Sequence, residues 1–411
     1  MPEQIETVII GGGQAGLALS YFLRQLGREH IILERARIAE RWRSERWDSL
    51  AFQLPNFMIN LPGHSYEGGD PDGFMHRDGV VAFLEEYARR ISPPIRCGIR
   101  ATALETSTTG RHLVRTDQFD LEASNVVVAT GPYQEPSIPS WSTDLPIGIQ
   151  QLSASRYTNS RQLPPGCVLV VGSGASGYQI AADLHQGGKG VYLSVGRHRR
   201  VPRRYRGKDF GWWTVQTGAA DRTREELPPG FLPPLVTGVN GGEDVDLRLL
   251  AADGVTLVGS LRGVRDGRFY FAADLVENLA LGDAGIVQFT KAVDEFILKR
   301  GLDAPEDALA DPSGAARLPE QPPITELDMR EAGITSVIWA TGYRYDFGWI
   351  KCPVLDADGI PVHRRGVTAV PGVHFLGLPR LHKIKSSFLW GVGEDAAYLA
   401  QHITTRPSRG S

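Results

Sequence analysis

The chain has 411 residues, 42% of them hydrophobic and 22% charged, which is typical of a globular protein with about two or three domains. Its formal net charge of −3 argues against a nucleic-acid partner or an anionic membrane surface, and the lack of an uncharged apolar run of about 18 residues argues against a membrane span. The three cysteines, Cys97, Cys167 and Cys352, are far apart, so we expect neither a metal site nor a disulfide framework, and a reducing cytoplasm fits best.

The first 34 residues predict a strand, a glycine loop, a helix and a second strand. Thr7–Ile10 and His30–Glu34 are apolar runs typical of strands, and Leu17–Leu26 has apolar residues at helical spacing. The loop is Gly11, Gly12, Gly13, Gln14, Ala15 and Gly16. In this Gly-x-Gly-x-x-Gly pattern the glycines allow a tight turn, a close approach to a pyrophosphate and close packing of helix and strand, while the helix N-terminus offers free N–H groups. The unit predicts a dinucleotide site.

Glu34 ends the second predicted strand, about 20 residues beyond the glycine loop. A carboxylate at this position accepts hydrogen bonds from both hydroxyls of a ribose and repels a 2′-phosphate. The first site is therefore predicted to hold FAD or NAD rather than NADP.

A second unit of the same kind follows at residue 168. Val168–Val171 predicts a strand, Tyr178–Gln186 a helix and Gly190–Val195 the next strand. The loop between the first strand and the helix is Gly172, Ser173, Gly174, Ala175, Ser176 and Gly177. No acid ends the last strand, and a basic run follows instead, with Arg197 first and Arg204 within it. Guanidinium groups suit a 2′-phosphate, which favours NADPH here, and the alternative is a solvated loop.

Two further segments repeat one another. Val126–Gly131 and Val337–Tyr343 each predict a buried strand that ends in Ala-Thr-Gly, a turn small enough for close approach to a ligand. Between the second unit and the later repeat, Asp274–Leu279 and Val287–Lys299 have apolar residues at helical spacing. The pattern predicts two helical segments there.

Taken together, these features resemble the flavin-containing monooxygenase superfamily over nearly the whole chain. The resemblance includes the tryptophan-containing segment Glu40–Arg43 before Trp47 and the C-terminal segment Gly391–Ala397. It implies an α/β protein with two Rossmann-like dinucleotide-binding domains. The FAD domain is expected to be discontinuous, over residues 1–158 and 324–411, with an NADPH domain at 159–323.

The resemblance also implies a reaction. NADPH reduces the flavin, the reduced flavin takes up O2 to give a C4a-hydroperoxyflavin, and one oxygen atom passes to a small-molecule substrate. The substrate atom is a heteroatom nitrogen or sulfur, a metalloid, or an aromatic or indolic carbon. The sequence is compatible with a homodimer.

The residues expected to bind the two cofactors fall into two groups. Those expected near FAD are Gly11, Gly13, Gln14, Ala15, Gly16, Glu34, Arg35, Arg41, Trp42, Ala101, Thr130, Gly131 and Asp395. Those expected near NADPH are Gly172, Ser173, Gly174, Ala175, Ser176, Gly177, Arg197, Arg204, Ala340, Thr341 and Gly342. Trp42 and Asp395 have plainer alternatives, since an aromatic ring can simply cover a sheet edge and an acid in a first turn suits the helix dipole.

Gln53 is the one catalytic candidate. An ungapped match around Leu50–Leu61 places it where family members that oxidise nitrogen or sulfur have an asparagine beside the flavin. Glutamine offers the same amide donor and acceptor on one more methylene. The alternative is an ordinary polar strand residue.

Two rival functions remain open on the sequence. One is an NADPH-dependent flavin reductase, oxidase or dehydrogenase without oxygenation, of which a disulfide reductase would need a redox cysteine pair that the sequence lacks. The other is a nucleotide-sensing protein without catalysis, which fits the poor match to the family fingerprint around Tyr157. That poor match also leaves ring-expanding ketone oxidation less supported.

Overall fold

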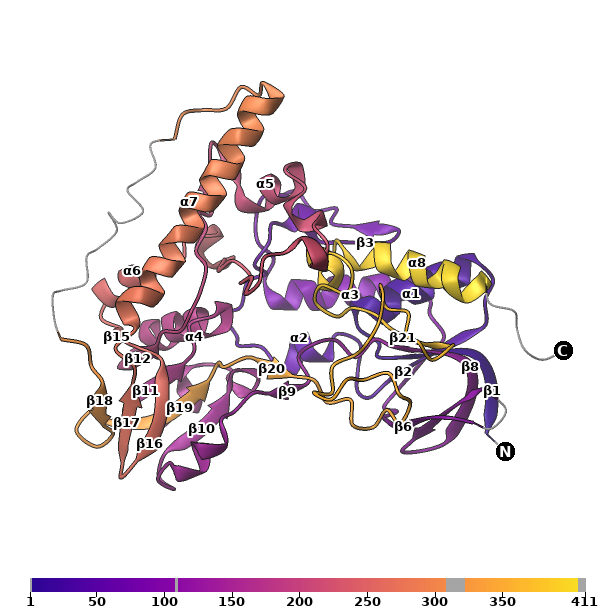
Figure 1. Ribbon diagram of the computed structural model, residues 1–411, viewed down its shortest axis with the longest axis horizontal. Coiled ribbons are helices and arrows are strands. Elements are labelled where there is room, and N and C mark those ends of the chain that lie inside the picture. The colour runs from indigo at the N-terminus through magenta and orange to yellow at the C-terminus, as the bar shows by residue number, and fades with distance from the viewer. Residues whose placement is uncertain (1, 108–109, 308–321, 406–411) are drawn as a thin grey trace.

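Two lobes make up the part of the chain that the structure describes. The computed structural model describes residues 2–107, 110–307 and 322–405. Figure 1 places the first lobe on the right and the second on the left. Strands β9 (Glu135–Pro136) and β20 (Tyr343–Arg344) pair antiparallel between the lobes, so the chain crosses from one lobe to the other and back along this short ladder.

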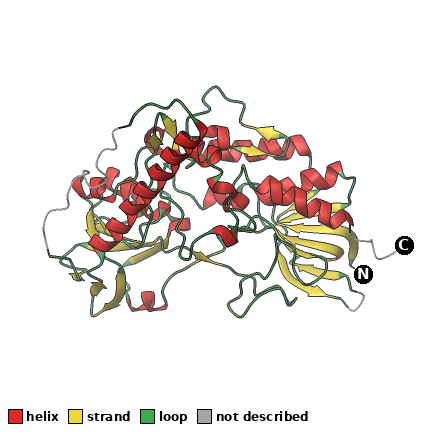
Figure 2. Cartoon of the chain, turned by 45° about the horizontal axis from the view of Figure 1, so that its top comes forward, coloured by secondary structure: helices red, strands yellow, loops and turns green. Residues whose placement is uncertain are grey.

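The first lobe is built on a seven-stranded sheet in the order β5-β2-β1-β8-β7-β6, with β21 paired to β8. Its strands are β1 (Glu3–Ile10), β2 (His30–Glu34), β5 (Ile95–Cys97), β6 (Ala101–Thr106), β7 (His112–Thr116), β8 (Asp120–Val128) and β21 (Val373–Phe375). The pairs among β5, β2, β1, β8 and β21 are parallel, and β6, β7 and β8 pair antiparallel. Figure 2 shows helices covering this sheet. They are α1 (Gln14–Gln25), α3 (Arg77–Ile91) and α8 (Val392–Thr405).

The second lobe is built on a five-stranded parallel sheet in the order β10-β19-β11-β12-β15. Its strands are β10 (Gln150–Ser153), β11 (Cys167–Val171), β12 (Val191–Ser194), β15 (Thr256–Val258) and β19 (Ile334–Trp339). An antiparallel sheet of β16 (Leu261–Arg265), β17 (Arg268–Phe271) and β18 (Glu326–Asp328) accompanies it, with helices α4 (Ala175–Gln186) and α6 (Leu247–Ala252). The predicted α/β class with two Rossmann-like units is confirmed.

Strands β10 and β19 lie in the second sheet, although the predicted boundaries at 158 and 324 assign their residues to the first domain. Residues of β10 and β19 pair in parallel, as Gln150 with Ser336, although they are far apart in the sequence. The second lobe therefore begins before residue 158 and ends after residue 324. Pairing between strands so far apart in the chain is invisible to local patterns, which explains the difference.

The remaining elements are short, except for one helix. They are α2 (Glu40–Ser44), α5 (Phe210–Gln216), and the strand pairs β3 (Asn60–Leu61) with β4 (His64–Ser65) and β13 (Arg204–Tyr205) with β14 (Lys208–Asp209). No helix within residues 2–107, 110–307 and 322–405 is long and apolar enough to cross a membrane.

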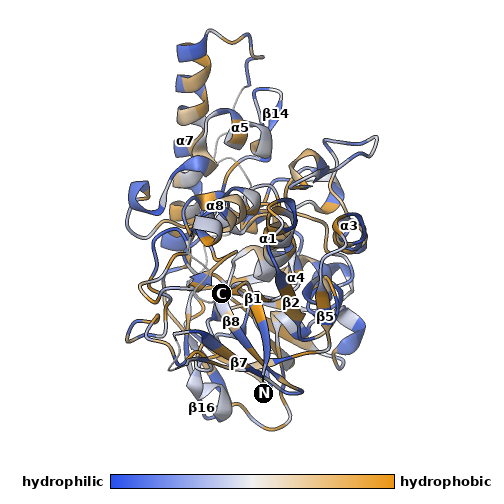
Figure 3. Ribbon diagram, turned by 90° about the vertical axis from the view of Figure 1, so that its right-hand side faces the viewer, coloured by the Kyte–Doolittle hydropathy of each residue, from blue (hydrophilic) through white to orange (hydrophobic). Residues whose placement is uncertain are grey.

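Helix α7 (Leu275–Arg300) corrects the prediction of two separate helical segments, because it is continuous over 26 residues. The apolar pattern is interrupted at Gly282 and Gly285, both buried. A Cβ on Gly282 would lie 2.5 Å from the ring of His198, and one on Gly285 would lie 2.5 Å from the carbonyl oxygen of Arg200. Glycine is needed at both positions for this close crossing. Figure 3 shows α7 rising beyond the rest of the molecule.

Candidate functional site

The first glycine loop joins β1 to α1 at the carboxyl edge of the first sheet. Gly11 has a φ of +116°, and a Cβ on it would lie 2.5 Å from the carbonyl oxygen of Ala129. A Cβ on Gly16 would clash with the carbonyl oxygen of Gly11. These two glycines therefore permit the turn and the packing of helix on strand, as their places in the pattern predict.

Gly13 leaves open space in front of helix α1. It is the N-cap residue, no side chain caps the helix, and the first turn contains no acid. No heavy atom lies within 4 Å of where a Cβ on Gly13 would stand. The side chain of Gln14 donates to the carbonyl of Ser387 at 2.6 Å, so the C-terminal segment borders this space. Free N–H groups beside an open space suit a pyrophosphate.

Glu34 is held against this loop by the backbone. Its Oε2 accepts from the N–H of Gly12 at 2.7 Å and its Oε1 from the N–H of Ala36 at 2.9 Å. A carboxylate can accept about four hydrogen bonds, so capacity is left for a ribose. A Cβ on Gly12 would lie 2.9 Å from the Glu34 Cβ, so this position also requires glycine. The sequence did not predict this requirement, although the run of three glycines is a signal for it.

The second glycine loop repeats this geometry. Gly172 has a φ of +103°, and a Cβ on it would lie 2.6 Å from the carbonyl oxygen of Ala340. A Cβ on Gly177 would clash with the carbonyl oxygen of Gly172. Gly174 caps α4 without a side-chain cap, has open space beside it and is followed by a first turn without acids, which includes Ala175 and Ser176. Ser173 Oγ lies 3.2 Å from the N–H of Gly196, just beyond β12.

The two Ala-Thr-Gly turns lie beside the two glycine loops. The N–H of Ala129 donates to the carbonyl of Ile10 at 2.8 Å, and that of Ala340 donates to the carbonyl of Val171 at 2.9 Å. Thr130 accepts from Gln134, Thr341 donates to Ser137, and Gly131 and Gly342 both have positive φ. The repeat seen in the sequence is therefore a repeat in space.

In the basic run after β12, some arginine side chains form ion pairs or hydrogen bonds within the protein and others do not. Arg200 is buried, with ion pairs to Asp246 at 2.8 Å and Asp283 at 2.5 Å, and Arg204 donates to the carbonyls of Gly241 and Gly242. Arg197 is exposed and makes no ion pair or hydrogen bond with the described residues. Arg197 is thus a member of the run whose guanidinium a ligand can reach.

The remaining residues expected near FAD lie around the end of β2. Arg35 and Arg41 both pair with Glu45, at 3.7 and 2.6 Å, and burial lowers the pKa of Arg41. The N–H of Ile99 donates to the carbonyl of Glu34 at 3.0 Å, which brings nearby Ala101 to this end of the sheet. Trp42 is half-buried and packs against the cores of both lobes, and Trp47 is buried.

Gln53 lies where the lobes meet. Its backbone carbonyl accepts from Arg203 Nη1 at 2.8 Å, and its side-chain amide makes no hydrogen bond with the described residues. Arg203 is 2% exposed, pairs with Asp209 at 2.7 and 2.9 Å, and lies 4.3 Å from the ring centroid of Phe74. Burial lowers the pKa of Arg203. Arg203 therefore ties the segment around Gln53 to the hairpin β13–β14.

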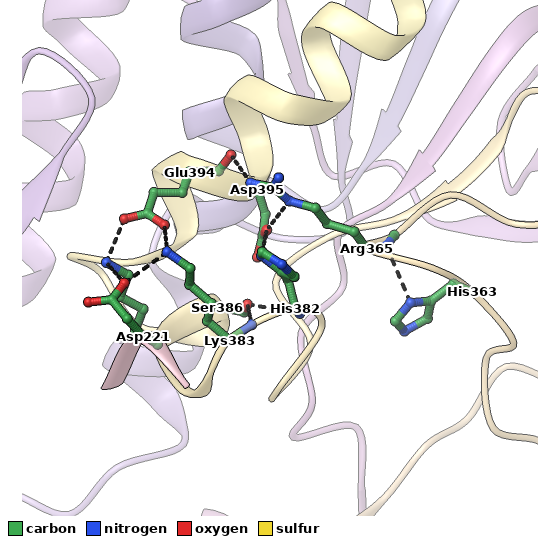
Figure 4. A network of polar contacts seen from close by, with 10 residues as sticks. Asp221, His363, Arg365, His382, Lys383, Ser386, Glu394 and Asp395 are labelled. Atoms are coloured by element: carbon green, nitrogen blue, oxygen red, sulfur yellow. Dashed lines mark hydrogen bonds and ion pairs between the residues drawn. The ribbon is translucent and has the colours of Figure 1, made fainter. Parts of the chain in front are cut away.

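Four charged side chains form a cluster that the sequence did not predict, which we call the charge clasp: Asp221, Lys383, Lys385 and Glu394. Figure 4 labels Asp221, Lys383 and Glu394. Lys383 Nζ lies 2.8 Å from Asp221 and 2.9 Å from Glu394, and Lys385 Nζ lies 2.8 and 2.5 Å from the same two carboxylates. The clasp fastens residues 219–221 to the C-terminal segment. The only sequence signal was the pair of lysines two residues apart.

Asp395 lies beside the clasp, at the start of α8. It is 2% exposed, and its Oδ1 accepts from Arg365 Nε at 3.2 Å (Figure 4). Its carboxylate is thus already paired within the protein, and contact with the flavin ribityl chain stays a prediction. The described residues contain no group of three or more His, Cys, Asp or Glu side chains that could hold a metal ion.

Comparisons with known proteins agree with this geometry. Residues 8–208 match the family model described as pyridine nucleotide-disulphide oxidoreductase. The chain is 32% identical to a protein of Geobacillus kaustophilus named as an uncharacterized oxidoreductase CzcO-like, over 98% of this chain and 99% of that protein. It is 26% identical to a probable indole-3-pyruvate monooxygenase of Arabidopsis thaliana, YUCCA3, over 97% of this chain and 86% of that protein.

A solved structure gives the same fold. The flavin-containing monooxygenase from Stenotrophomonas maltophilia superimposes with a TM-score of 0.67 at 20% sequence identity, over 98% of both chains. The resemblance drawn from the sequence is confirmed.

Proposed function

This chain belongs to the CzcO-like oxidoreductases. We propose that it is an FAD-containing monooxygenase of the flavin-containing monooxygenase superfamily and that it uses NADPH and O2. One observation carries the proposal. The chain has two open helix N-termini, each preceded by a glycine with room for a pyrophosphate. Their surroundings differ, because Glu34 is held against the first loop, whereas the exposed Arg197 follows Gly196, whose N–H donates to Ser173 of the second loop.

The residues present fit FAD at the first loop. A Cβ on Gly13 would fill the space where the pyrophosphate is expected, and Glu34 is fixed by two backbone N–H groups in the position to accept from ribose hydroxyls. The second loop fits NADPH, because Arg197 has no partner among the described residues and a guanidinium binds a 2′-phosphate well.

Bound flavin supplies the redox and oxygen-transfer chemistry, and the protein supplies binding and orientation. Glu34 and the α1 N-terminus hold the first nucleotide, and Arg197 with the α4 N-terminus holds the second. The buried Arg203 holds the backbone of Gln53 at the junction of the lobes, so that its amide can donate or accept a hydrogen bond there. The substrate is a small molecule whose nitrogen, sulfur, metalloid atom or aromatic carbon accepts oxygen.

The experiment is rapid anaerobic mixing of the purified yellow protein with NADPH and, separately, with NADH. We expect NADPH to bleach the flavin absorption band at a lower concentration than NADH. Equal concentrations for both coenzymes, or no bleaching, would contradict the assignment of the second site. An NADPH-dependent flavin reductase or oxidase would also bleach, so the reaction with O2 separates the two functions.

We further propose that two copies associate through the outer face of α7. Val276 is 73% and Val287 54% exposed there, and Ala284 lies between them. In an antiparallel pair of α7 helices centred on Ala284, Glu277 of each copy faces Lys291 of the other, and the small central residue permits close approach. Such a self-complementary patch suits a two-fold dimer.

A further inference from the structure

A cavity of about 610 Å³ lies between residues 224–231, which follow Asp221 in the chain, and the C-terminal loops around residues 345, 360–363 and 378–380. Polar side chains lining it are Arg224, Tyr345, His363 and Arg380, and no aspartate or glutamate does. Its volume is within the range of about 300–1,000 Å³ found for small-molecule sites. In Figure 4, His363 lies next to Arg365, on the other side of Asp395 from the charge clasp.

Residues of the cavity lining, or next to it in the chain, contact the first glycine loop and the basic run. One wall includes Leu378, and the preceding Gly377 is so close to α1 that a Cβ on it would lie 2.6 Å from the Cβ of Ala15 in the first loop. Another wall includes Phe231, whose ring centroid lies 5.9 Å from the guanidinium of Arg199 in the basic run. A ligand in the cavity would therefore lie between the first glycine loop and the basic run.

The two arginines of the cavity carry uncompensated charge. Neither Arg224 nor Arg380 forms an ion pair or side-chain hydrogen bond within the described parts of the chain, unlike Arg200 and Arg203. His363 Nδ1 accepts from the N–H of Gly366 at 3.2 Å, so the neutral ring carries its proton on the other nitrogen. Burial, followed by the charge of Arg224, lowers the pKa of His363, which keeps the ring neutral at pH 7.

The rest of the lining is apolar. It consists mainly of Leu227, Pro228, Phe231, Ile360, Pro361 and Leu378. Two guanidinium groups without an opposing carboxylate attract an anion, and the apolar walls offer contact surface to an apolar body. The pattern matches a molecule with a carboxylate at one end and an apolar or aromatic group at the other.

We propose that this cavity binds the oxygen-accepting substrate, and that the substrate is an apolar or aromatic carboxylate held by Arg224 and Arg380. That the bound carboxylate is the substrate rests on the proposed function. Binding of a carboxylate in the cavity can be measured without any reaction. A phosphate of NADPH has similar anion chemistry, and the experiment separates the two sources.

The test uses the FAD-loaded protein saturated with NADP+, so that the coenzyme site is filled. Calorimetry measures the dissociation constants of hexanoate, 3-phenylpropionate and indole-3-acetate, each against its neutral amide. We expect at least one carboxylate to bind about 10- to 100-fold more tightly than its amide, the range for a charge-assisted hydrogen bond. Failure of all three carboxylates to exceed their amides would overturn the proposal.

The variants R224Q and R380Q are expected to remove that preference without changing the affinity for the amide. Both side chains are exposed and without protein partners, so the fold should survive, and thermal unfolding checks this. R330Q is the matched control, because Arg330 is also exposed and follows β18 in the second lobe. If R224Q and R380Q instead weaken NADP+ and leave the carboxylates unchanged, the arginines belong to the coenzyme site and the proposal is wrong. Binding is measured without O2, so the proposed oxygenation can fail while this site stands.

Discussion

The glycines of the two loops serve two different physical purposes. Gly16 and Gly177 allow the helix to touch the preceding turn, because any Cβ there would clash with a backbone carbonyl. Gly13 and Gly174 instead face open space. The sequence pattern predicted both purposes, because the strand–loop–helix unit is local in the chain.

The variant G13A separates fold from cofactor binding. Its φ of −81° is accessible to alanine and its Cβ meets nothing, so we expect a loss in stability of no more than about 1 kcal/mol. The new methyl group would occupy the expected pyrophosphate position and weaken FAD binding by about 1–3 kcal/mol. Flavin release measured by fluorescence tests this, with G148A as control. Wild-type FAD affinity in G13A would contradict the assignment.

Arg197 sets the coenzyme preference if the second site is as proposed. The variant R197A should raise the KM for NADPH about 10- to 100-fold and leave that for NADH nearly unchanged, because a charge-assisted contact to the 2′-phosphate is lost. Flavin reduction rates at varied coenzyme concentration measure it, and R161A, which removes another exposed arginine, is the control. An unchanged ratio would show that the basic run is only a solvated loop.

Among the helices and strands, the sequence pattern predicted best those whose formation depends on residues close together in the chain. Strands β1, β2, β11 and β12 and the helices after the loops fall where apolar periodicity placed them. The apolar pattern predicted helical segments at both ends of α7 but not the stretch between them, where Gly282 and Gly285 allow a close crossing over His198 and Arg200. The charge clasp, the cavity and the pairing of β10 with β19 join residues far apart in the chain, so no pattern could reveal them.

The charge clasp should hold two segments together in a pH-dependent way. Burial works to raise the pKa of Glu394, but the hydrogen bonds from Lys385 and Lys383 outweigh it and the pKa is lowered. A carboxylate with a lowered pKa stabilises the fold above its ordinary value of 4.5 and loses this as pH falls through the folded value. Because the Glu394 side chain is 43% exposed and solvent screens its ion pairs, we expect E394Q to cost no more than about 1 kcal/mol at pH 7 and less at pH 3.

Chemical unfolding at the two pH values measures this difference. The control is E225Q, since Glu225 is exposed on the same segment and has no ion pair within the described residues. An equal cost of E394Q at pH 7 and pH 3 would mean that its contribution is packing rather than charge.

At the scale of the whole molecule, the proposed dimer can be tested by exchanging charges on α7. The variant K291E places two glutamates opposite each other at the proposed interface and should shift the protein toward monomer in sedimentation velocity. The double variant E277K/K291E restores opposite charges and should recover the dimer, while K299E, near the end of α7, should change little. A wild-type monomer at all concentrations would refute the interface.

The proposed function assigns reduction to one nucleotide and oxygen chemistry to the other, and the fate of O2 tests this division most directly. NADPH-reduced protein is mixed with O2 while NADP+ stays bound, and the absorption spectrum and released peroxide are followed. For a monooxygenase we expect a long-lived spectrum that differs from those of both oxidised and reduced flavin, with peroxide appearing only as this spectrum decays. Immediate return of the oxidised spectrum with one peroxide for each NADPH would contradict a monooxygenase and favour an oxidase.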